Sequence, residues 1–140
     1  MTIKEKEAQL IEDFELFEDW MDKYGYIIDL GKSGASLDDA SKREELLING
    51  CQSRVWLEAE MKDGQVYYRA DSDAVIPKGI AAMLTGLFSG HRPDEILDFS
   101  PDFVDKIGLG QHLSPTRSNG LSAMIQQIKN YALAFKSKEA

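Results

Sequence analysis

The strongest nucleophile in this chain of 140 residues is the thiol of its single cysteine, Cys51. It stands directly after Asn49-Gly50, a dipeptide typical of turns, and is followed by Gln52, Ser53 and Arg54. Free cysteines are often buried and inert, but polar neighbours on a turn are poor core material. The positive charge of Arg54 favours the thiolate, which is the reactive form of the side chain. These residues indicate a reactive thiol on a loop.

A single cysteine also excludes several kinds of site. An intrachain disulfide is impossible, and no Cys-x-x-Cys redox pair exists. Structural zinc sites and iron–sulfur clusters need more ligands than one cysteine and two histidines supply. We therefore expect no resident metal and no resident cofactor.

The two histidines have different expected roles. His91 follows Gly90 at the predicted end of a helix, where a protonated imidazole interacts favourably with the helix dipole. His112 lies in a polar loop broken by glycine and proline, and it is a possible base for Cys51 in a hydrolase or acyl-transferase. That alternative lacks an oxyanion-hole motif and a clear third residue to orient the base. A further alternative is a non-catalytic binding module, which would tolerate the loss of Cys51.

The charge and hydropathy of the sequence limit which compartment and which partners are expected. The chain has 24 acidic and 16 basic residues, a net charge of −8, which disfavours nucleic acid as a partner. The first dozen residues are too charged for a signal peptide, and no apolar run is long enough to span a membrane. The sequence therefore predicts a cytoplasmic protein without a membrane partner.

The first half of the chain predicts helices followed by strands. Thr2 and Glu5 form a capping-box pattern before an apolar helical face that extends to Met21. A second, short helix is expected over 22–30, ended by Gly31-Lys32-Ser33-Gly34. Alternation over 55–61, the turn signal Asp63-Gly64 and a return over 65–70 predict a β-hairpin, with a third strand at or before 71–75.

The second half predicts helices. An apolar helix is expected over 78–88, and Pro93 and Pro101 each suit the first position of a further helix. A clean apolar stripe over 121–135 predicts a final helix of about four turns. The segment Asp71-Ser72-Asp73 reads as a helix cap, because it offers too few oxygen ligands for a divalent metal ion. The result is an α+β chain, and we expect one domain over residues 1–140.

Four stretches, in order along the chain, carry a resemblance to the SufE family, the sulfur-acceptor partners of cysteine desulfurases. They are Tyr24-Gly25-Tyr26-Ile27-Ile28-Asp29-Leu30-Gly31, Gly50-Cys51-Gln52-Ser53-Arg54-Val55-Trp56, Asp71-Ser72-Asp73-Ala74-Val75-Ile76-Pro77-Lys78-Gly79 and Gln111-His112-Leu113-Ser114-Pro115-Thr116-Arg117-Ser118-Asn119-Gly120-Leu121. One departure is Leu46, where several members carry an asparagine whose amide can brace the cysteine loop.

The resemblance implies a fold, a reaction and partners. The fold is a SufE/NifU-like α+β domain with a three-stranded antiparallel sheet flanked by helices. Cys51 takes sulfane sulfur as a persulfide from a cysteine desulfurase of the SufS kind or a paralogue, and passes it to an iron–sulfur scaffold. The pyridoxal phosphate belongs to the partner, so the chain is an accessory protein and not an enzyme by itself.

The same resemblance assigns further residues to the cysteine loop or to partner contacts. Arg117 corresponds to a family arginine near that loop, and Gln52 and Ser53 shape it. Asp73 and His112 are weaker assignments, for which structural roles fit equally well.

Overall fold

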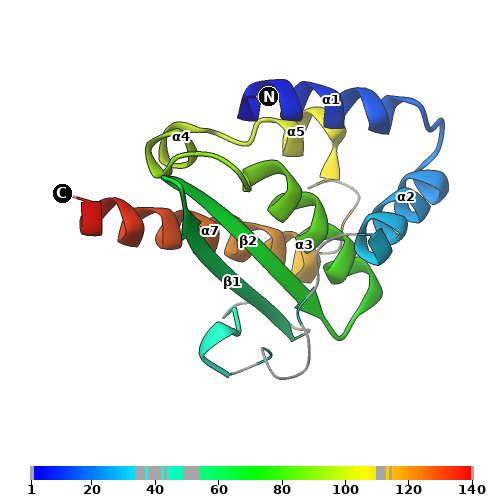
Figure 1. The fold of residues 1–140 in the computed structure, drawn as a ribbon. Coiled ribbons are helices and arrows are strands. Elements are labelled where there is room, and N and C mark those ends of the chain that lie inside the picture. The colour runs from blue at the N-terminus through cyan, green and yellow to red at the C-terminus, as the bar shows by residue number, and fades with distance from the viewer. Residues whose placement is uncertain are drawn as a thin grey trace.

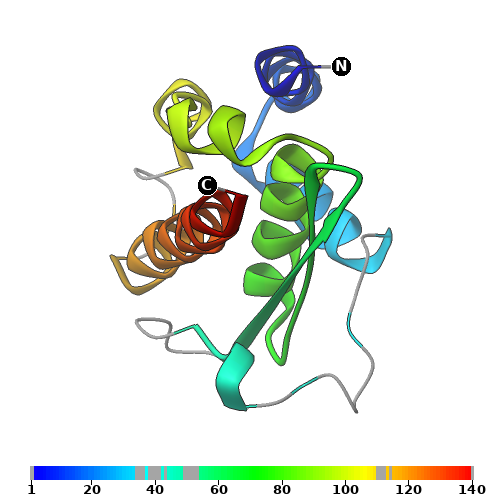
Figure 2. The ribbon, with the colours of Figure 1, turned by 60° about the vertical axis from the view of Figure 1, so that its left-hand side comes forward.

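The computed structural model describes residues 2–33, 37, 42, 44–48, 54–109, 113 and 115–139, with backbone alone for 115–118 and 139. Figures 1 and 2 show one β-hairpin with helices packed against one of its faces. In chain order the elements are α1 (Ile3–Glu15), α2 (Trp20–Ser33), the 3₁₀ turn η2 (Glu44–Leu46), β1 (Val55–Lys62), β2 (Gln65–Ser72), α3 (Val75–Phe88), α4 (Pro93–Asp98), α5 (Phe103–Ile107) and α7 (Pro115–Glu139).

The predicted hairpin is confirmed. Strands β1 and β2 pair antiparallel from Val55 opposite Ser72 to Lys62 opposite Gln65. Asp63 and Gly64 connect them with φ angles of 54° and 81°, the left-handed conformation that tight hairpin turns require.

The expectation of a third strand is wrong for the described residues, whose sheet has two strands. The chain after Ser72 turns instead of pairing, because the Asp73 side chain accepts a hydrogen bond from the Arg54 N–H and α3 begins at Val75. On the other side of β1, Leu47 forms one isolated antiparallel bridge to Trp56. A second isolated antiparallel bridge joins Val66 of β2 to His91, and neither bridge extends into a third strand within the described residues.

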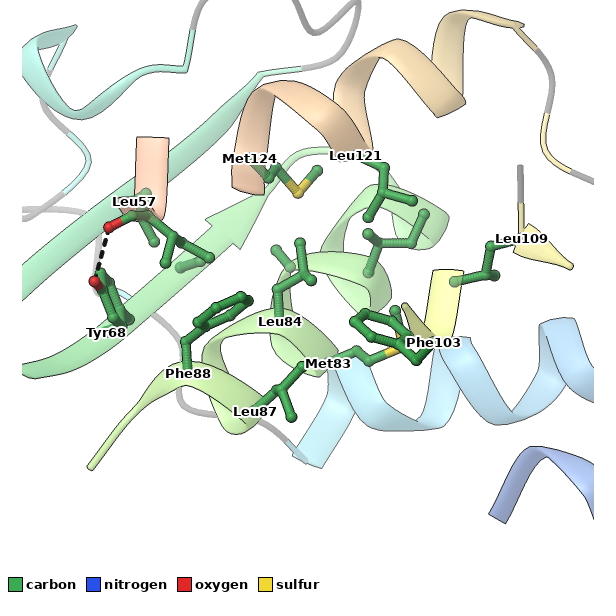
Figure 3. Close-up of a cluster of buried hydrophobic side chains, with 14 of the residues drawn as sticks. Leu57, Tyr68, Met83, Leu84, Leu87, Phe88, Phe103, Leu109, Leu121 and Met124 are labelled. Atoms are coloured by element: carbon green, nitrogen blue, oxygen red, sulfur yellow. Dashed lines mark hydrogen bonds between the residues drawn. The ribbon is translucent and has the colours of Figure 1, made fainter. Parts of the chain in front are cut away.

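Helix α3 is the centre of the core. It packs against β2 on one side and α2 on the other, and α7 crosses it (Figures 1 and 2). Leu84 and Phe88 of α3 are fully buried and meet Leu57 of β1 and Met124 of α7 in one apolar cluster (Figure 3). Burial of this cluster supplies the main free energy of folding.

Helix α7 is longer than its apolar stripe predicts, and two tyrosines fasten it to the hairpin. The buried Tyr68 hydroxyl of β2 donates to the Ile128 carbonyl at 2.8 Å (Figure 3), and burial raises its pKa. The Tyr131 hydroxyl of α7 donates to the Leu57 carbonyl of β1 at 3.0 Å. The two bonds run in opposite directions between the helix and the sheet.

For the N-terminal helices, one expectation from the sequence is confirmed and another is wrong. Thr2 and Glu5 form the predicted capping box, with reciprocal bonds of 3.0 and 3.1 Å. Gly31 does not end α2 as expected, because it lies inside that helix and faces α3. A β-carbon on Gly31 would lie 2.9 Å from the Gly79 nitrogen, so the glycine serves close packing of two helices.

The expectation of a helix starting at Pro101 is also wrong by two residues. Helix α5 begins at Phe103, whose N–H donates to the Glu7 carboxylate of α1 at 3.1 Å. A glutamate that is distant in the sequence therefore binds the N–H at the start of this helix. Pro93 does open α4 as predicted, with Glu95 reaching back to the Arg92 N–H.

His91 does not act as a charged cap at the end of α3. It is 4% exposed, and burial, followed by the neighbouring charge of Lys6, lowers its pKa and favours the neutral form. The Lys6 ammonium instead donates to the Gly86 and Ser89 carbonyls at this helix end, at 3.2 and 2.9 Å. A cation from α1 thus fills the place that the sequence assigned to histidine. Among the described helices, none is long and apolar enough to cross a membrane.

Candidate functional site

The residues that flank the predicted site at Cys51, together with the groups that bind them, form the frame of that site. Arg54 and Asp73 lie within the described residues, and both are exposed. Cys51, Gln52, Ser53 and His112 lie outside them, as does the alternative pairing of Cys51 with His112. Arg117 belongs to the first turns of α7, where the backbone alone is described. The structure therefore describes the two stems, which are the residues that flank the cysteine segment 49–53 in the chain.

The upstream stem is Leu47-Ile48. The Ile48 N–H donates to the Val55 carbonyl at 2.9 Å, and Leu47 bridges Trp56. Ile48 is 8% exposed and rests on the apolar core. Residues 49–53 thus connect two backbone segments that are hydrogen-bonded to each other.

The upstream stem packs on apolar side chains. Ile48 lines a cavity of about 10 Å³ together with apolar side chains from both strands, α3 and α7, which are Val55, Leu57, Ala70, Ala81, Leu84, Met124 and Ile128, with Thr85 at its wall. A space this small does not hold an ordered water molecule without polar partners. The upstream stem is therefore fixed by packing as well as by its backbone hydrogen bond.

The downstream stem is Arg54, held by the turn that follows β2. The Arg54 N–H donates to the Asp73 carboxylate at 3.1 Å, and the Asp73 N–H donates to the Arg54 carbonyl at 3.2 Å. The Ser72 hydroxyl donates to the same carbonyl at 2.7 Å and accepts from the Ala74 N–H at 3.2 Å. Asp73, assigned to the loop by resemblance, therefore binds the backbone of Arg54, the downstream stem of the cysteine segment.

Asp71, two positions before Asp73, has a different environment. Asp71 is 4% exposed, and its carboxylate faces Lys42 at 3.3 Å and Lys78 at 3.5 Å. Burial is the largest single influence and raises its pKa, but the Ser72 N–H at 2.8 Å and the two ammonium groups outweigh it. The pKa of Asp71 is consequently lowered, so this carboxylate is charged at neutral pH.

The expected cap role of the Asp71–Asp73 segment is not what the structure shows. Ala74 is the N-cap of α3, and no side chain caps it. The polar groups of this segment bind instead to Arg54, Lys42 and Lys78. Among the described residues, no cluster of three or more His, Cys, Asp or Glu side chains is arranged to bind a metal ion.

Sequence reasoning missed Lys42, Ser72 and Lys78 as parts of this frame. Two of them stand in the stretch Asp71–Gly79 that carries the family resemblance, so a signal for them existed. Lys42 had no such signal, because its carboxylate partner lies 29 positions further along the chain.

The architecture defines a class of protein: an α+β fold in which a β-hairpin and its neighbouring turn clamp both stems of a cysteine-bearing segment. The same fold occurs in the solution structure of a hypothetical protein from Thermus thermophilus. That structure is similar with a TM-score of 0.76 and 20% sequence identity, over 92% of this chain and 94% of that one.

Sequence comparison assigns the family. The model of the SufE Fe-S metabolism associated domain matches residues 8–132. An uncharacterized SufE-like protein of Rhizobium meliloti (strain 1021) is 39% identical over 129 residues, which cover 89% of this chain and 92% of that protein. The chain belongs to the SufE family, whose domain is associated with Fe–S metabolism.

Proposed function

We propose that this chain is the sulfur acceptor of a cysteine desulfurase and carries sulfur, as a persulfide on Cys51, to an iron–sulfur assembly scaffold. The observation that carries the proposal is the frame around the only cysteine of the chain: both stems of residues 49–53 are fixed by hydrogen bonds to the same hairpin. Membership of the SufE family supports the same role.

The transfer step is a thiol–persulfide exchange. The Cys51 thiolate attacks the outer, sulfane sulfur of the persulfide on the desulfurase, and the bond between the two partner sulfurs breaks. The electron pair of that bond leaves on the partner cysteine as a thiolate, while the transferred sulfur keeps its proton. The products are a Cys51 persulfide and the regenerated thiolate of the desulfurase.

The chain has residues that suit each part of this step. The exposed Arg54 places a positive charge three positions from Cys51, where it favours the thiolate. We assign Gln52 and Ser53 to the shape of the loop, and His112 and Arg117 to contacts with the loop or the partner.

A single thiol also suits a carrier. A second cysteine nearby would attack the persulfide, form a disulfide and release sulfide. The chemistry that removes sulfur from free cysteine belongs to the pyridoxal phosphate of the desulfurase. This chain therefore acts as an accessory protein and turns over nothing by itself.

The test is to incubate the chain with a SufS-type desulfurase and free cysteine, and to read sulfur loading from the intact mass. The parent should gain the mass of one sulfur atom and should stimulate the desulfurase, whereas Cys51→Ser should do neither at an unchanged melting temperature. Equal loading of the two proteins would contradict the proposal. Cleavage of a thioester by the parent alone would favour the hydrolase alternative.

A further inference from the structure

A cavity of about 230 Å³ lies between α1, α2 and the second half of α3. Its apolar lining consists of Leu10 of α1, Leu30 of α2, and Ala82, Met83 and Leu87 of α3. Gly86 leaves the wall open on α3, because a β-carbon built on this glycine would meet nothing within 4 Å. The lining residues do not belong to the frame of the cysteine segment, so the cavity is a second candidate site.

The charged groups of the cavity come from one face of α1. Lys6, Gln9 and Asp13 follow one another at three- and four-residue steps, which place them on the same side of the helix. The seven positions from Lys6 to Asp13 correspond to about two helical turns, or about 10 Å along the axis. The cavity therefore has an ammonium toward one end and a carboxylate toward the other, with Leu10 between them.

The Lys6 ammonium is half-buried and bound to neutral acceptors. It donates to the Gly86 and Ser89 carbonyls at 3.2 and 2.9 Å, and burial lowers its pKa. Within the part of the chain that the structure describes, it forms no ion pair with a carboxylate. An ammonium has three N–H donors, so one of them remains for an anion in the cavity.

The Asp13 carboxylate is also half-buried, and it is bound to neutral donors. It accepts from the Gln9 amide at 3.0 Å and from the Tyr26 hydroxyl at 3.3 Å. Among the described residues, no cation pairs with it. The two oxygens of a carboxylate together accept up to about four hydrogen bonds, so Asp13 can also bind an ammonium. Both charges gain from a partner, because partial burial reduces their screening by water.

We propose that this cavity binds a linear zwitterion, whose carboxylate pairs with Lys6, whose ammonium pairs with Asp13, and whose aliphatic chain packs on the apolar lining. A ligand with a single charge would leave one of the two side chains unpaired. An α-amino acid holds its two charges too close together to reach both. The same chemistry occurs in a free ω-amino acid and in a lysine at the carboxyl end of a peptide.

The experiment titrates the full-length, isotope-labelled chain with 6-aminohexanoate and follows the backbone amide shifts by NMR. Saturable shifts are expected in α1 and in the second half of α3. Hexanoate and hexylamine should each bind at least about threefold more weakly, because each lacks one of the two ion pairs. Glycine, which carries both charges on one carbon, should produce no saturable shift over the same concentrations.

Nα-acetyl-lysine separates the two sources of the ligand, because it imitates the carboxyl end of a peptide. Binding as tight as that of 6-aminohexanoate would assign the site to a peptide end, and weaker binding would assign it to a free ω-amino acid. Both results support a site for a linear zwitterion.

Two variants test the charges separately. Lys6→Met should remove the preference for 6-aminohexanoate over hexylamine, and Asp13→Asn should remove the preference over hexanoate. Each variant is scored by a ratio of two affinities, so a change in overall stability does not imitate the result. A preference that survives in either variant would contradict the assigned pairing.

Gly86→Leu tests the cavity itself, because its side chain would fill the open wall. The matched control is Gly25→Leu, since Gly25 is an exposed glycine of α2 that also has open space at its β-carbon and does not line the cavity. Gly86→Leu should abolish the saturable shifts, whereas Gly25→Leu should keep the parent affinity. The proposal is overturned by an unchanged affinity in Gly86→Leu, by equal binding of hexanoate or hexylamine to the parent, or by the absence of saturable shifts.

Discussion

Gly31 of α2 and Gly79 of α3 bring the backbones of two helices into direct contact. A β-carbon on Gly79 would lie 2.1 Å from the Ile27 carbonyl oxygen, and one on Gly31 would lie 2.9 Å from the Gly79 nitrogen. Such distances are too short for any side chain, so both positions require glycine. The contact fixes the start of α3, and with it Lys78 and the turn that binds Arg54.

Gly79→Ala should destabilise the fold by about 3 kcal/mol, because overpacking forces two backbones apart. Gly86→Ala is the matched control on the same helix, since its β-carbon would meet nothing within 4 Å. That variant should gain up to about 1 kcal/mol from the better helix propensity of alanine. Urea unfolding measures both, and equal stabilities of the two variants would contradict the packing argument.

How far the sequence predicts the fold depends on the distance between partners along the chain. The capping box of Thr2 and the Asp63-Gly64 turn were predictable, because each completes its hydrogen bonds or backbone geometry within a few residues. The helix start at Phe103 was not, because its cap is Glu7, on α1. Gly31 resembles a helix breaker in the sequence. Its packing role depends on contact with α3, which the residues next to Gly31 in the sequence do not indicate.

The candidate site also has some features that the sequence predicts and others that it does not. The reactive type of Cys51 and the positive charge of Arg54 follow from residue identity alone. The ion pair between Lys42 and Asp71 does not follow from the sequence. A carboxylate shortly before a helix resembles an ordinary helix cap, whereas the structure shows Asp71 buried between two lysines. Contacts between residues distant in the chain therefore determine the role of Asp71, which its sequence neighbours do not indicate.

Tyr68→Phe should cost about 1–2 kcal/mol of stability, because it leaves the buried Ile128 carbonyl without the hydroxyl that binds it. Tyr131→Phe removes a similar bond, to Leu57, from a half-buried position where water can replace the hydroxyl, so about 0.5 kcal/mol is expected. Urea unfolding compares the pair. A larger loss in Tyr131→Phe would show that burial does not control the cost.

His91 should make the fold less stable in mild acid. Its pKa in the folded state lies below the ordinary 6.5, chiefly through burial and then through the charge of Lys6, with Glu95 acting in the opposite direction. The unfolded chain therefore binds the proton first, and stability present above about pH 6.5 is lost as the pH falls through the folded pKa. The buried ring nitrogen Nε2 has no hydrogen-bond partner, which is consistent with a neutral ring.

The measurement for His91 is urea unfolding of the parent and of His91→Gln between about pH 5 and about pH 7.5. The difference between the two proteins isolates this residue from the other groups that titrate. The parent should lose stability relative to the variant as the pH falls. Parallel pH profiles would show that protonation of His91 is not linked to folding. The carboxylates with lowered pKa values, Glu5, Asp71 and Asp94, titrate at lower pH and affect the two proteins alike.

Ser72→Ala should loosen the downstream stem of the cysteine segment. The Ser72 hydroxyl donates to the Arg54 carbonyl and accepts from the Ala74 N–H, so its loss removes two links between β1, β2 and the start of α3. A stability loss of about 1–2 kcal/mol is expected, with faster hydrogen exchange at the Arg54 and Asp73 amides, whose bonds to each other remain.

Ser89→Ala is the matched control for this prediction, because the Ser89 hydroxyl accepts from the Tyr68 N–H at 2.9 Å, further along β2. It removes a comparable bond to β2 without touching either stem. Exchange at Arg54 and Asp73 should therefore stay at the parent rate in Ser89→Ala. If both serine variants accelerate exchange at these amides equally, the stem responds to the stability of the whole hairpin and not to the Ser72 hydroxyl.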